Sequence, residues 1–424
     1  MKAEDLRDGL GFSIAEIAAG WSDKTGRFTD FVRHGRSRNK QTAIYVSSTD
    51  PWHRSSDLDP KVEQPGFDLL RDSGMIGSAK VMMSVPALYD TPENVGALAQ
   101  WLSASRYPLS SFEIGEEPDG QSADADHFGK AYLNMAKAIR ATFPAILIGG
   151  PSFQTIEENF SQFPKPGNQW LRQFRDFLES RSASGDFQFC TFEWYPFDDV
   201  ADDPLDQLLE ANSLLEQNLK RLNGQGMKDL PWMITEYGFS AFGAKAEVEL
   251  PGALFNFDCA MLSLQLGAQT AYLYGYEPNE LINEVGKEWG NNMLFLRSDD
   301  GIVELPTYWA AKMLTTKLCA PKGNHALIRT SGNTKQVGCY AVLRPDGKLC
   351  IALINRVANA SEVHLSTSAK VKGWTSWSYS SARYHWQPAG EGGHPVKNLP
   401  PVRGILQANT LRLPPLSITV LQAN

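Results

Sequence analysis

Two glutamates stand where apolar segments of the sequence give way to turns. Glu117 ends the segment 111–117, which reads Ser-Phe-Glu-Ile-Gly-Glu-Glu and continues into Pro-Asp-Gly. Glu236 ends the segment 232–236, which reads Trp-Met-Ile-Thr-Glu and continues into Tyr-Gly. An apolar run that ends in an acid before a turn is typical of a strand that leads into an active-site loop. Two carboxylates delivered to one cleft are the minimum equipment for cleaving a glycosidic bond.

The elements that would position these carboxylates are short apolar segments separated by helical patterns. The segments recur at a spacing of roughly 30 to 45 residues, which is the length of a strand-plus-helix unit. They cover residues 42–47, 79–85, 111–114, 145–149, 187–192, 232–235 and 270–274. A segment at 28–32 is either a first strand or one arm of a hairpin. Apolar stripes at helical spacing lie between several of them, at 95–102, 170–178 and 208–222. This alternation predicts an α/β fold with a parallel sheet, a (β/α)8 TIM barrel.

The expected barrel would bring the two glutamates together. With the segment at 28–32 counted as the first strand, Glu117 follows the fourth strand and Glu236 follows the seventh. The carboxyl ends of barrel strands surround one mouth, so we expect both side chains to reach the same cleft. Retaining cleavage of a glycoside needs two carboxyls about 5 Å apart, one protonated and one ionised.

The pattern of the sequence changes after about residue 318. Short alternating segments appear at 337–343, 349–354, 361–365 and 417–421, and the first two flank a Pro-Asp-Gly turn. An Asp-Gly turn between apolar strands is a strong hairpin signal. We therefore expect residues 1–318 to form the barrel, with an irregular segment at 1–41, and residues 319–424 to form an antiparallel β-sandwich. The Pro- and Gly-rich stretch 388–404 predicts a long surface loop.

Composition limits the kinds of partner. The chain has 424 residues and a net charge of −8, which argues against nucleic acid or an anionic membrane. No segment is apolar over the length of a membrane span. The five cysteines are scattered without a CxxC motif and the histidines lack partners at ligand spacing, so neither a metal nor a cofactor is predicted. The N-terminus shows no apolar leader, which favours a reducing, cytoplasmic location, although a leader missing from this sequence leaves secretion open. The sequence carries no signal for an oligomeric state.

Four segments resemble motifs of glycoside hydrolase clan A. Residues 113–119 look like the Asn-Glu-Pro acid/base motif, and residues 234–238 look like the nucleophile strand. Residues 148–152 and 192–197 resemble the fifth and sixth strands of the β-xylosidase/iduronidase and heparanase-like families. The resemblance covers roughly residues 79–318, and a β-sandwich follows the barrel in the same families. It implies a retaining hydrolase that acts on a carbohydrate without a cofactor, with Glu117 as acid/base and Glu236 as nucleophile.

Two residues depart from the clan A pattern. Glu116 stands where the family has an asparagine that binds the sugar 2-hydroxyl, and Glu193 stands where a sixth-strand histidine is common. Mutual repulsion among extra carboxylates raises the pKa of at least one of them. Glu116 and Glu193 could select a cationic or hydroxyl-rich substrate. They could equally mark a catalytically drifted carbohydrate-binding protein on the same scaffold. A lyase is the weaker alternative, because no predicted strand end supplies a Schiff-base lysine.

Aromatic and basic residues near the predicted strand ends are further candidates for substrate binding. Tyr195 and Tyr237 follow the sixth and seventh strands, where a tyrosine can hydrogen-bond the nucleophile or simply fill the core. The other candidates are Trp52, Tyr276 and Trp289 for stacking on a sugar ring and Arg33 for holding a carboxylate ionised. Each of these four could instead anchor or solvate a loop.

Overall fold

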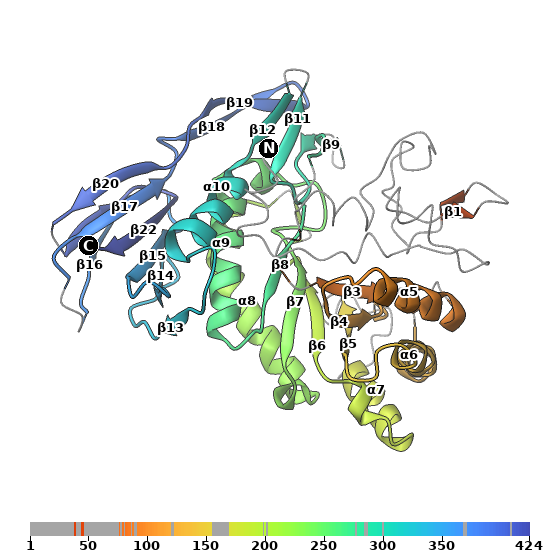
Figure 1. Ribbon diagram of the computed structural model, residues 1–424. Coiled ribbons are helices and arrows are strands. Elements are labelled where there is room, and N and C mark those ends of the chain that lie inside the picture. The colour runs from red at the N-terminus through yellow and green to blue at the C-terminus, as the bar shows by residue number, and fades with distance from the viewer. Residues whose placement is uncertain are drawn as a thin grey trace.

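The computed structural model of the chain combines a parallel sheet wrapped by helices with layers of antiparallel strands beside it (Figure 1). The structure describes residues 38–39, 44–45, 76, 79, 81–85, 87–88, 91–119, 123–154, 169–197, 199–200, 202–275, 278–283, 287–298, 301–367, 371–407 and 409–424. Among the helices in these ranges, none has the length and apolar character that crossing a membrane requires.

Six parallel strands form the first sheet, in the order in which they occur along the chain. They are β3 (Val81–Val85), β4 (Leu109–Ile114), β5 (Leu147–Phe153), β6 (Cys190–Trp194), β7 (Trp232–Tyr237) and β8 (Ala271–Leu273). All six overlap segments that the sequence predicts as strands, so this part of the α/β prediction is confirmed. Sequential parallel neighbours with crossover helices make a half-barrel, whose carboxyl edge collects the loops that follow the strands.

The predicted barrel strand at 42–47 has a different partner. Within the described residues, β2 (Ile44–Tyr45) pairs antiparallel with β1 (Arg38–Asn39) and is not hydrogen-bonded to the parallel sheet. The prediction of a parallel barrel strand there is therefore wrong, and a hairpin is what forms. The hairpin that the sequence left open has 28–32 as its other arm, and that segment lies outside the described residues.

Helices cover the outer face of the half-barrel. They are α5 (Pro92–Ala104), α6 (Ala125–Arg140), α7 (Trp170–Ser180), α8 (Pro204–Gly224), α9 (Leu250–Gln265) and α10 (Pro306–Met313). Short turns of helix are η2 (Ser184–Asp186), η3 (Met227–Asp229), η4 (Lys245–Val248) and the π-helical η5 (Leu314–Leu318). Side-chain caps start three of the long helices: Thr91 accepts from Asn94 N at 3.2 Å, and aspartates cap α6 and α8. The three predicted apolar stripes lie on α5, α7 and α8.

The connection from β8 to α10 carries two small antiparallel ribbons. They pair β9 (Ile282–Asn283) with β10 (Glu288–Trp289), and β11 (Phe295–Ser298) with β12 (Gly301–Glu304). The first ribbon is tied to the loop that follows β7, because Ala244 N donates to Gly290 O at 2.9 Å. The loops after β7 and β8 are thus joined above the carboxyl edge of the sheet.

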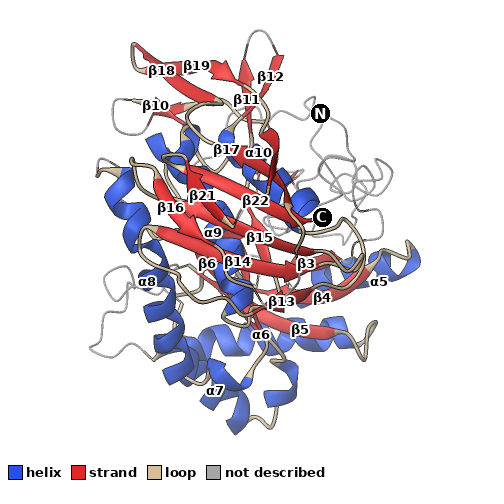
Figure 2. Cartoon of the chain, turned by 90° about the vertical axis from the view of Figure 1, so that its left-hand side faces the viewer, coloured by secondary structure: helices blue, strands red, loops and turns tan. Residues whose placement is uncertain are grey.

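The C-terminal strands form a second, antiparallel layer system. The main sheet has six strands in the order β13-β14-β15-β22-β17-β20. Its strands are β13 (Ala326–Ile328), β14 (Val337–Leu343), β15 (Leu349–Asn355), β17 (Trp374–Tyr379), β20 (Val402–Leu406) and β22 (Ser417–Ala423). One face packs against the ribbon of β16 (Ser361–His364) and β21 (Thr410–Leu413) around the buried Trp374 and Leu413. The other face joins the main core through Tyr340 and Val420, and Figure 2 shows this sheet in front of α9.

A buried ion pair joins the two parts of the molecule. Arg356, just after β15, donates from Nε to Asp258 Oδ2 on α9 at 2.6 Å, and both residues are at most 2% exposed. The Tyr340 hydroxyl donates to the other oxygen of Asp258. Every residue of α9 from Leu250 to Ser263 is buried, so this helix lies in the middle of the molecule rather than on its surface.

The stretch 388–404 is not the loop that its Pro and Gly content predicts. β18 (Tyr384–Ala389) pairs with β19 (Gly392–Asn398), and β20 begins at Val402. Pro395 lies opposite Trp386, next to a shift in register. A two-stranded ribbon tolerates proline in this way, because only one side of each strand needs hydrogen-bond partners.

Candidate active site

The carboxyl ends of β4, β6 and β7 bring four glutamates into electrostatic contact. Glu116 and Glu117 follow β4, Glu193 lies on β6 and Glu236 lies on β7. Burial raises the pKa of Glu193 well above its usual range, and the negative charges of the other three glutamates raise it further. These four predicted site residues are therefore neighbours at one edge of the sheet. With Glu193 buried and only 3% exposed, the protonated form of its carboxyl is the favoured one.

An irregularity in the strand register sets Glu193 beside Glu236. Along β6 and β7, Phe192 lies opposite Ile234, but the next pair is Glu193 opposite Glu236, so Thr235 is skipped. Backbones of neighbouring strands lie about 4.8 Å apart, and the two carboxyls therefore start from adjacent positions. Bulges that re-aim side chains in this way are common next to active sites.

Tyr195 makes the contact with the nucleophile position that the sequence predicts. Its hydroxyl donates to Glu236 Oε2 at 3.0 Å. The ring meets Tyr274 edge-on, with centroids 6.4 Å apart, which fixes the direction from which the hydroxyl approaches. A hydrogen bond donated to a carboxylate favours the ionised form, which is the form that a nucleophile needs.

The backbone after β4 is held in an unusual conformation. Glu117 has φ of 45° and Ser152 has φ of 55°, both in the left-handed region that side chains rarely adopt. Glu117 N donates to Ser152 O at 2.8 Å, so each unusual residue supports the other. Nearby, a Cβ on Gly150 would lie 2.5 Å from Ile114 O, which only glycine avoids. Such strain persists where surrounding structure enforces it, typically at functional sites.

Ser152 also links the glutamates to the interior of the sheet. Its hydroxyl donates to Glu193 Oε1 at 3.0 Å and lies 3.0 Å from the Thr235 hydroxyl. Glu117 reaches the same serine through its backbone, since its N donates to Ser152 O, and its negative charge raises the pKa of Glu193. A continuous chain of polar groups therefore runs from β7 through β5 and β6 to the end of β4.

A fifth carboxyl, that of Glu113, is buried within β4, close to the carboxyl edge of the parallel sheet. Burial raises its pKa to about 6, and hydrogen bonds from the hydroxyls of Thr191, Thr235 and Ser84 oppose that rise. The Ser84 hydroxyl donates to Glu113 Oε2 at 3.3 Å. Sequence reasoning missed Glu113, although it is the last residue but one of β4 and an acid within an apolar strand is itself an unusual signal.

The loop after β7 is held by a buried glutamate that sequence reasoning also missed. Glu247 of η4 accepts from Phe239 N at 2.9 Å and from Ser240 N at 3.4 Å. Burial raises the pKa of Glu247 to about 7, and these two backbone donors oppose the rise. Gly238 leaves no room for a side chain, because a Cβ there would lie 1.6 Å from Asn292 Oδ1. The residues just beyond Glu236 are thus closely packed.

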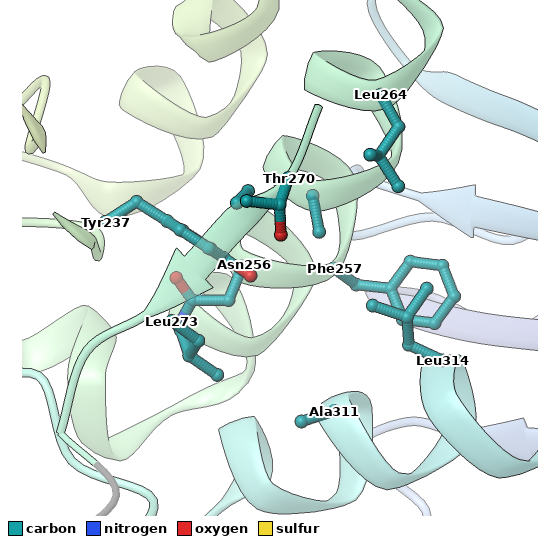
Figure 3. Close-up of a pocket in the computed structure, with 10 residues that line it drawn as sticks. Tyr237, Asn256, Phe257, Leu264, Thr270, Leu273, Ala311 and Leu314 are labelled. Atoms are coloured by element: carbon teal, nitrogen blue, oxygen red, sulfur yellow. The ribbon is translucent and has the colours of Figure 1, made fainter. Parts of the chain in front are cut away.

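Tyr237 does not join the carboxylates. It follows Glu236 on the same strand and therefore faces the opposite side of the sheet. There it lines a cavity of about 190 Å³ with residues of α9 and α10, and Figure 3 shows it pointing toward Asn256. This placement does not support the predicted role of Tyr237 in substrate binding, because its ring lies on the helix side of the sheet.

The remaining candidates are separate from this cluster. Trp289 lies on β10, in the ribbon tied to the loop after β7, and is partly exposed. Trp52, Arg33 and Tyr276 lie outside the described residues. Within the described ranges, no group of three His, Cys, Asp or Glu side chains is arranged to hold a metal ion.

Known proteins match the chain in structure but not in sequence. No protein-family model matches the sequence, and a search of curated proteins finds no match. A GH51 arabinofuranosidase from Xanthomonas axonopodis pv. citri superposes with a TM-score of 0.64 at 14% identity, covering 100% of this chain and 89% of that one. The chain therefore shares its fold with this arabinofuranosidase. A family 44 xyloglucanase from Paenibacillus polymyxa gives 0.60 at 10% identity, over 98% of this chain and 92% of that one. A bifunctional glucanase-xylanase from a metagenome library gives 0.54 at 16% identity, over 79% and 69%.

Proposed function

We propose that the protein is a retaining glycoside hydrolase, with Glu236 as the nucleophile and Glu117 as the acid/base. The observation that carries the proposal is the meeting of Glu117, Glu193 and Glu236 at the carboxyl edge of a half-barrel that glycosidases share. Two carboxyls with different environments are what double displacement needs. We also propose that residues 1–318 form one catalytic barrel domain and that residues 319–424 form a β-sandwich.

In the proposed first step, Glu236 attacks the anomeric carbon and the bond to the leaving oxygen breaks. Glu117 gives its proton to that oxygen, and the sugar stays bound as an ester of Glu236. In the second step Glu117 removes a proton from water, whose oxygen attacks the anomeric carbon and releases Glu236 as a carboxylate. Tyr195 supports both steps by keeping the Glu236 oxygens oriented. Glu116 would contact the sugar beside the bond that is cleaved.

The sugar would contact the protein through further residues of the mouth. Trp289 is a candidate platform for a ring, because aromatic faces bind the apolar side of sugars and its ribbon is tied to the loop after β7. The contacts predicted for Trp52, Arg33 and Tyr276 stay predictions.

A panel of aryl glycosides tests this function. It should include arabinofuranosides, xylosides and glucosides, because arabinofuranosidase, xylanase and glucanase activities are named for the structures that match. We expect hydrolysis of at least one, and Glu117→Ala should lower kcat by about 10² to 10⁴ for a leaving group that needs protonation. Glu236→Ala should lower kcat at least as much, whereas Glu362→Ala on the exposed face of β16 should change nothing.

External azide separates the two roles. It should rescue Glu117→Ala and give a glycosyl azide of retained configuration, while Glu236→Ala should give the inverted azide. If Glu236→Ala hydrolysed glycosides at the wild-type rate, the nucleophile assignment would fail. Binding of a sugar by the wild type without hydrolysis of any glycoside would favour the alternative, a carbohydrate-binding protein on this scaffold.

A further inference from the structure

The cavity on the helix side of the parallel sheet is separate from the carboxylate cluster. It has a volume of about 190 Å³ and lies between the strands β7 and β8 and the helices α9 and α10. Tyr237 forms its wall on β7, one residue after Glu236, so the cavity and the carboxylates lie on opposite sides of the same strand. Most of the lining is apolar, with Phe257 and Leu273 among its buried residues.

One polar atom in this cavity lacks a hydrogen-bond donor. Asn256 of α9 is only 4% exposed, and its Nδ2 donates to Thr307 Oγ1 at 3.3 Å. Among the described residues, no group donates to its Oδ1. Figure 3 shows Tyr237 pointing toward Asn256 from the opposite wall. A buried acceptor without a donor is unfavourable, so the cavity favours a ligand that brings a donor to this oxygen.

The volume of the cavity suits a ligand of ring size. An apolar cavity of about 150 Å³ in another protein stays dry and binds benzene, so about 190 Å³ has room for such a ring and one further heavy atom. A single water could meet the Asn256 oxygen but would leave most of the apolar volume empty. Leu264 and Leu314 of the lining are partly exposed, whereas Asn256 is buried, which places the opening and the polar atom at different parts of the cavity.

We propose that this cavity is a binding site for a small neutral aromatic alcohol. The ring would lie against Phe257 and Leu273, and the hydroxyl would donate to Asn256 Oδ1. None of the described lining residues is charged, and a charged ligand would lose its hydration without a counter-ion, so the ligand must be neutral. The aromatic rings of Tyr237 and Phe257 favour an aromatic partner over an aliphatic one of equal size. The proposal does not depend on the proposed hydrolase activity.

Calorimetric titration with phenol and toluene tests the site. The two probes have the same ring and differ in one heavy atom, which is a donor in phenol and a methyl group in toluene. Near pH 7 phenol is neutral, and the wild type should bind it roughly tenfold more tightly than toluene, because only phenol satisfies Asn256 Oδ1. In Asn256→Leu, which replaces the amide with an apolar side chain of similar size, this preference should be lost and toluene should bind at least as tightly as phenol.

Two further substitutions fill the cavity from different helices. Ala260→Leu on α9 and Ala311→Leu on α10 each add three carbon atoms to a buried lining residue, so each should abolish the binding of both probes. Ala382→Leu, the same change at an exposed turn, should bind both probes like the wild type. Phenol should raise the melting temperature of the wild type and of Ala382→Leu but not that of the filled variants, and the melting curves also show which variants are folded.

The outcomes separate this site from weaker explanations. Saturable binding of phenol that either filled variant abolishes, with a preference over toluene that Asn256→Leu removes, supports the proposal. No saturable binding to the wild type overturns it, and so does phenol binding that persists in the folded filled variants, because the probe would then bind elsewhere. Tighter binding of toluene than of phenol by the wild type would also overturn it, since Asn256 would then select nothing. The titration needs no glycoside, so a failure of the proposed hydrolase function would leave this result unchanged.

Discussion

The substitution Glu247→Gln should change how the stability of the protein depends on pH. Glu247 is fully buried in η4, and its pKa is about 7 in the folded protein against an ordinary value of 4.5. The folded protein therefore binds this proton more tightly than the unfolded chain does. Stability from this group is fully present below about pH 4.5 and is lost as pH rises toward 7. At 1.36 kcal/mol per pKa unit, the loss is about 3 kcal/mol.

Glutamine resembles the protonated carboxyl and cannot ionise. Its side-chain oxygen can still accept from Phe239 N and Ser240 N, so the loop after β7 keeps its anchor. Other buried acids, such as Glu113 and Glu193, titrate alike in both proteins and cancel from the comparison. The stability of the variant relative to the wild type should therefore rise by about 3 kcal/mol between pH 4 and pH 8.

Urea unfolding at a series of pH values measures this difference. The free energy of unfolding is extrapolated to water at each pH for the wild type, for Glu247→Gln and for the exposed control Glu362→Gln. The control should follow the wild type within about 0.5 kcal/mol throughout. A flat difference for Glu247→Gln, or one that falls with rising pH, would mean that Glu247 is ionised in the folded protein and would refute the reasoning.

Three further substitutions test the site and the packing. Tyr195→Phe removes the donor to Glu236, so kcat/KM should fall about tenfold and its acidic limb should move to higher pH, as a pH–rate profile would show. Gly238→Ala puts a methyl where there is no space and should destabilise the protein by about 1 to 3 kcal/mol in thermal unfolding. Arg356→Met leaves Asp258 buried without its partner and should cost about 3 to 5 kcal/mol in urea unfolding, whereas the double variant with Asp258→Asn should cost less.

Each of these predictions has a result that contradicts it. An unmoved acidic limb in Tyr195→Phe would show that the hydroxyl does not favour the ionised nucleophile. A wild-type melting temperature in Gly238→Ala would mean that the loop adjusts without cost. Equal losses in the single and double variants of the ion pair would mean that Arg356 contributes packing rather than charge compensation.

The sequence predicts the parallel strands well and the direction of individual side chains less well. Parallel strands are buried on both faces and therefore appear in the sequence as continuous apolar runs. Such runs, separated by helical stripes, predict the half-barrel independently of the loop sequences. Tyr195 contacts Glu236 as the sequence predicts, whereas Tyr237 lies away from the carboxylates. Tyr195 lies two positions after Glu193 and shares its side of the strand, whereas Tyr237 directly follows Glu236 and faces the helices.

Other features depend on contacts that local sequence does not reveal. Ser152 joins Glu193 only because an irregular β5 and the bulge between β6 and β7 bring their side chains together. Nothing in the sequence around Glu247 marks it as buried, and its pKa is raised only because tertiary packing excludes water from its carboxyl. The ribbon at β18 and β19 was hidden by its Pro and Gly content, since propensity is a weak guide where pairing with a neighbour supplies the stability.

The burial of α9 on every side has a consequence for anyone who would shorten this protein. In a free-standing barrel a helix at this position would turn one face to solvent, but here that face is covered by the antiparallel sheet and holds Asp258. Truncation after residue 318 would uncover a wide apolar surface together with an unpaired acid. A minimal version would therefore need a redesigned outer face on α9. Exchange of the C-terminal strands between related proteins would likewise succeed only when that helix travels with them.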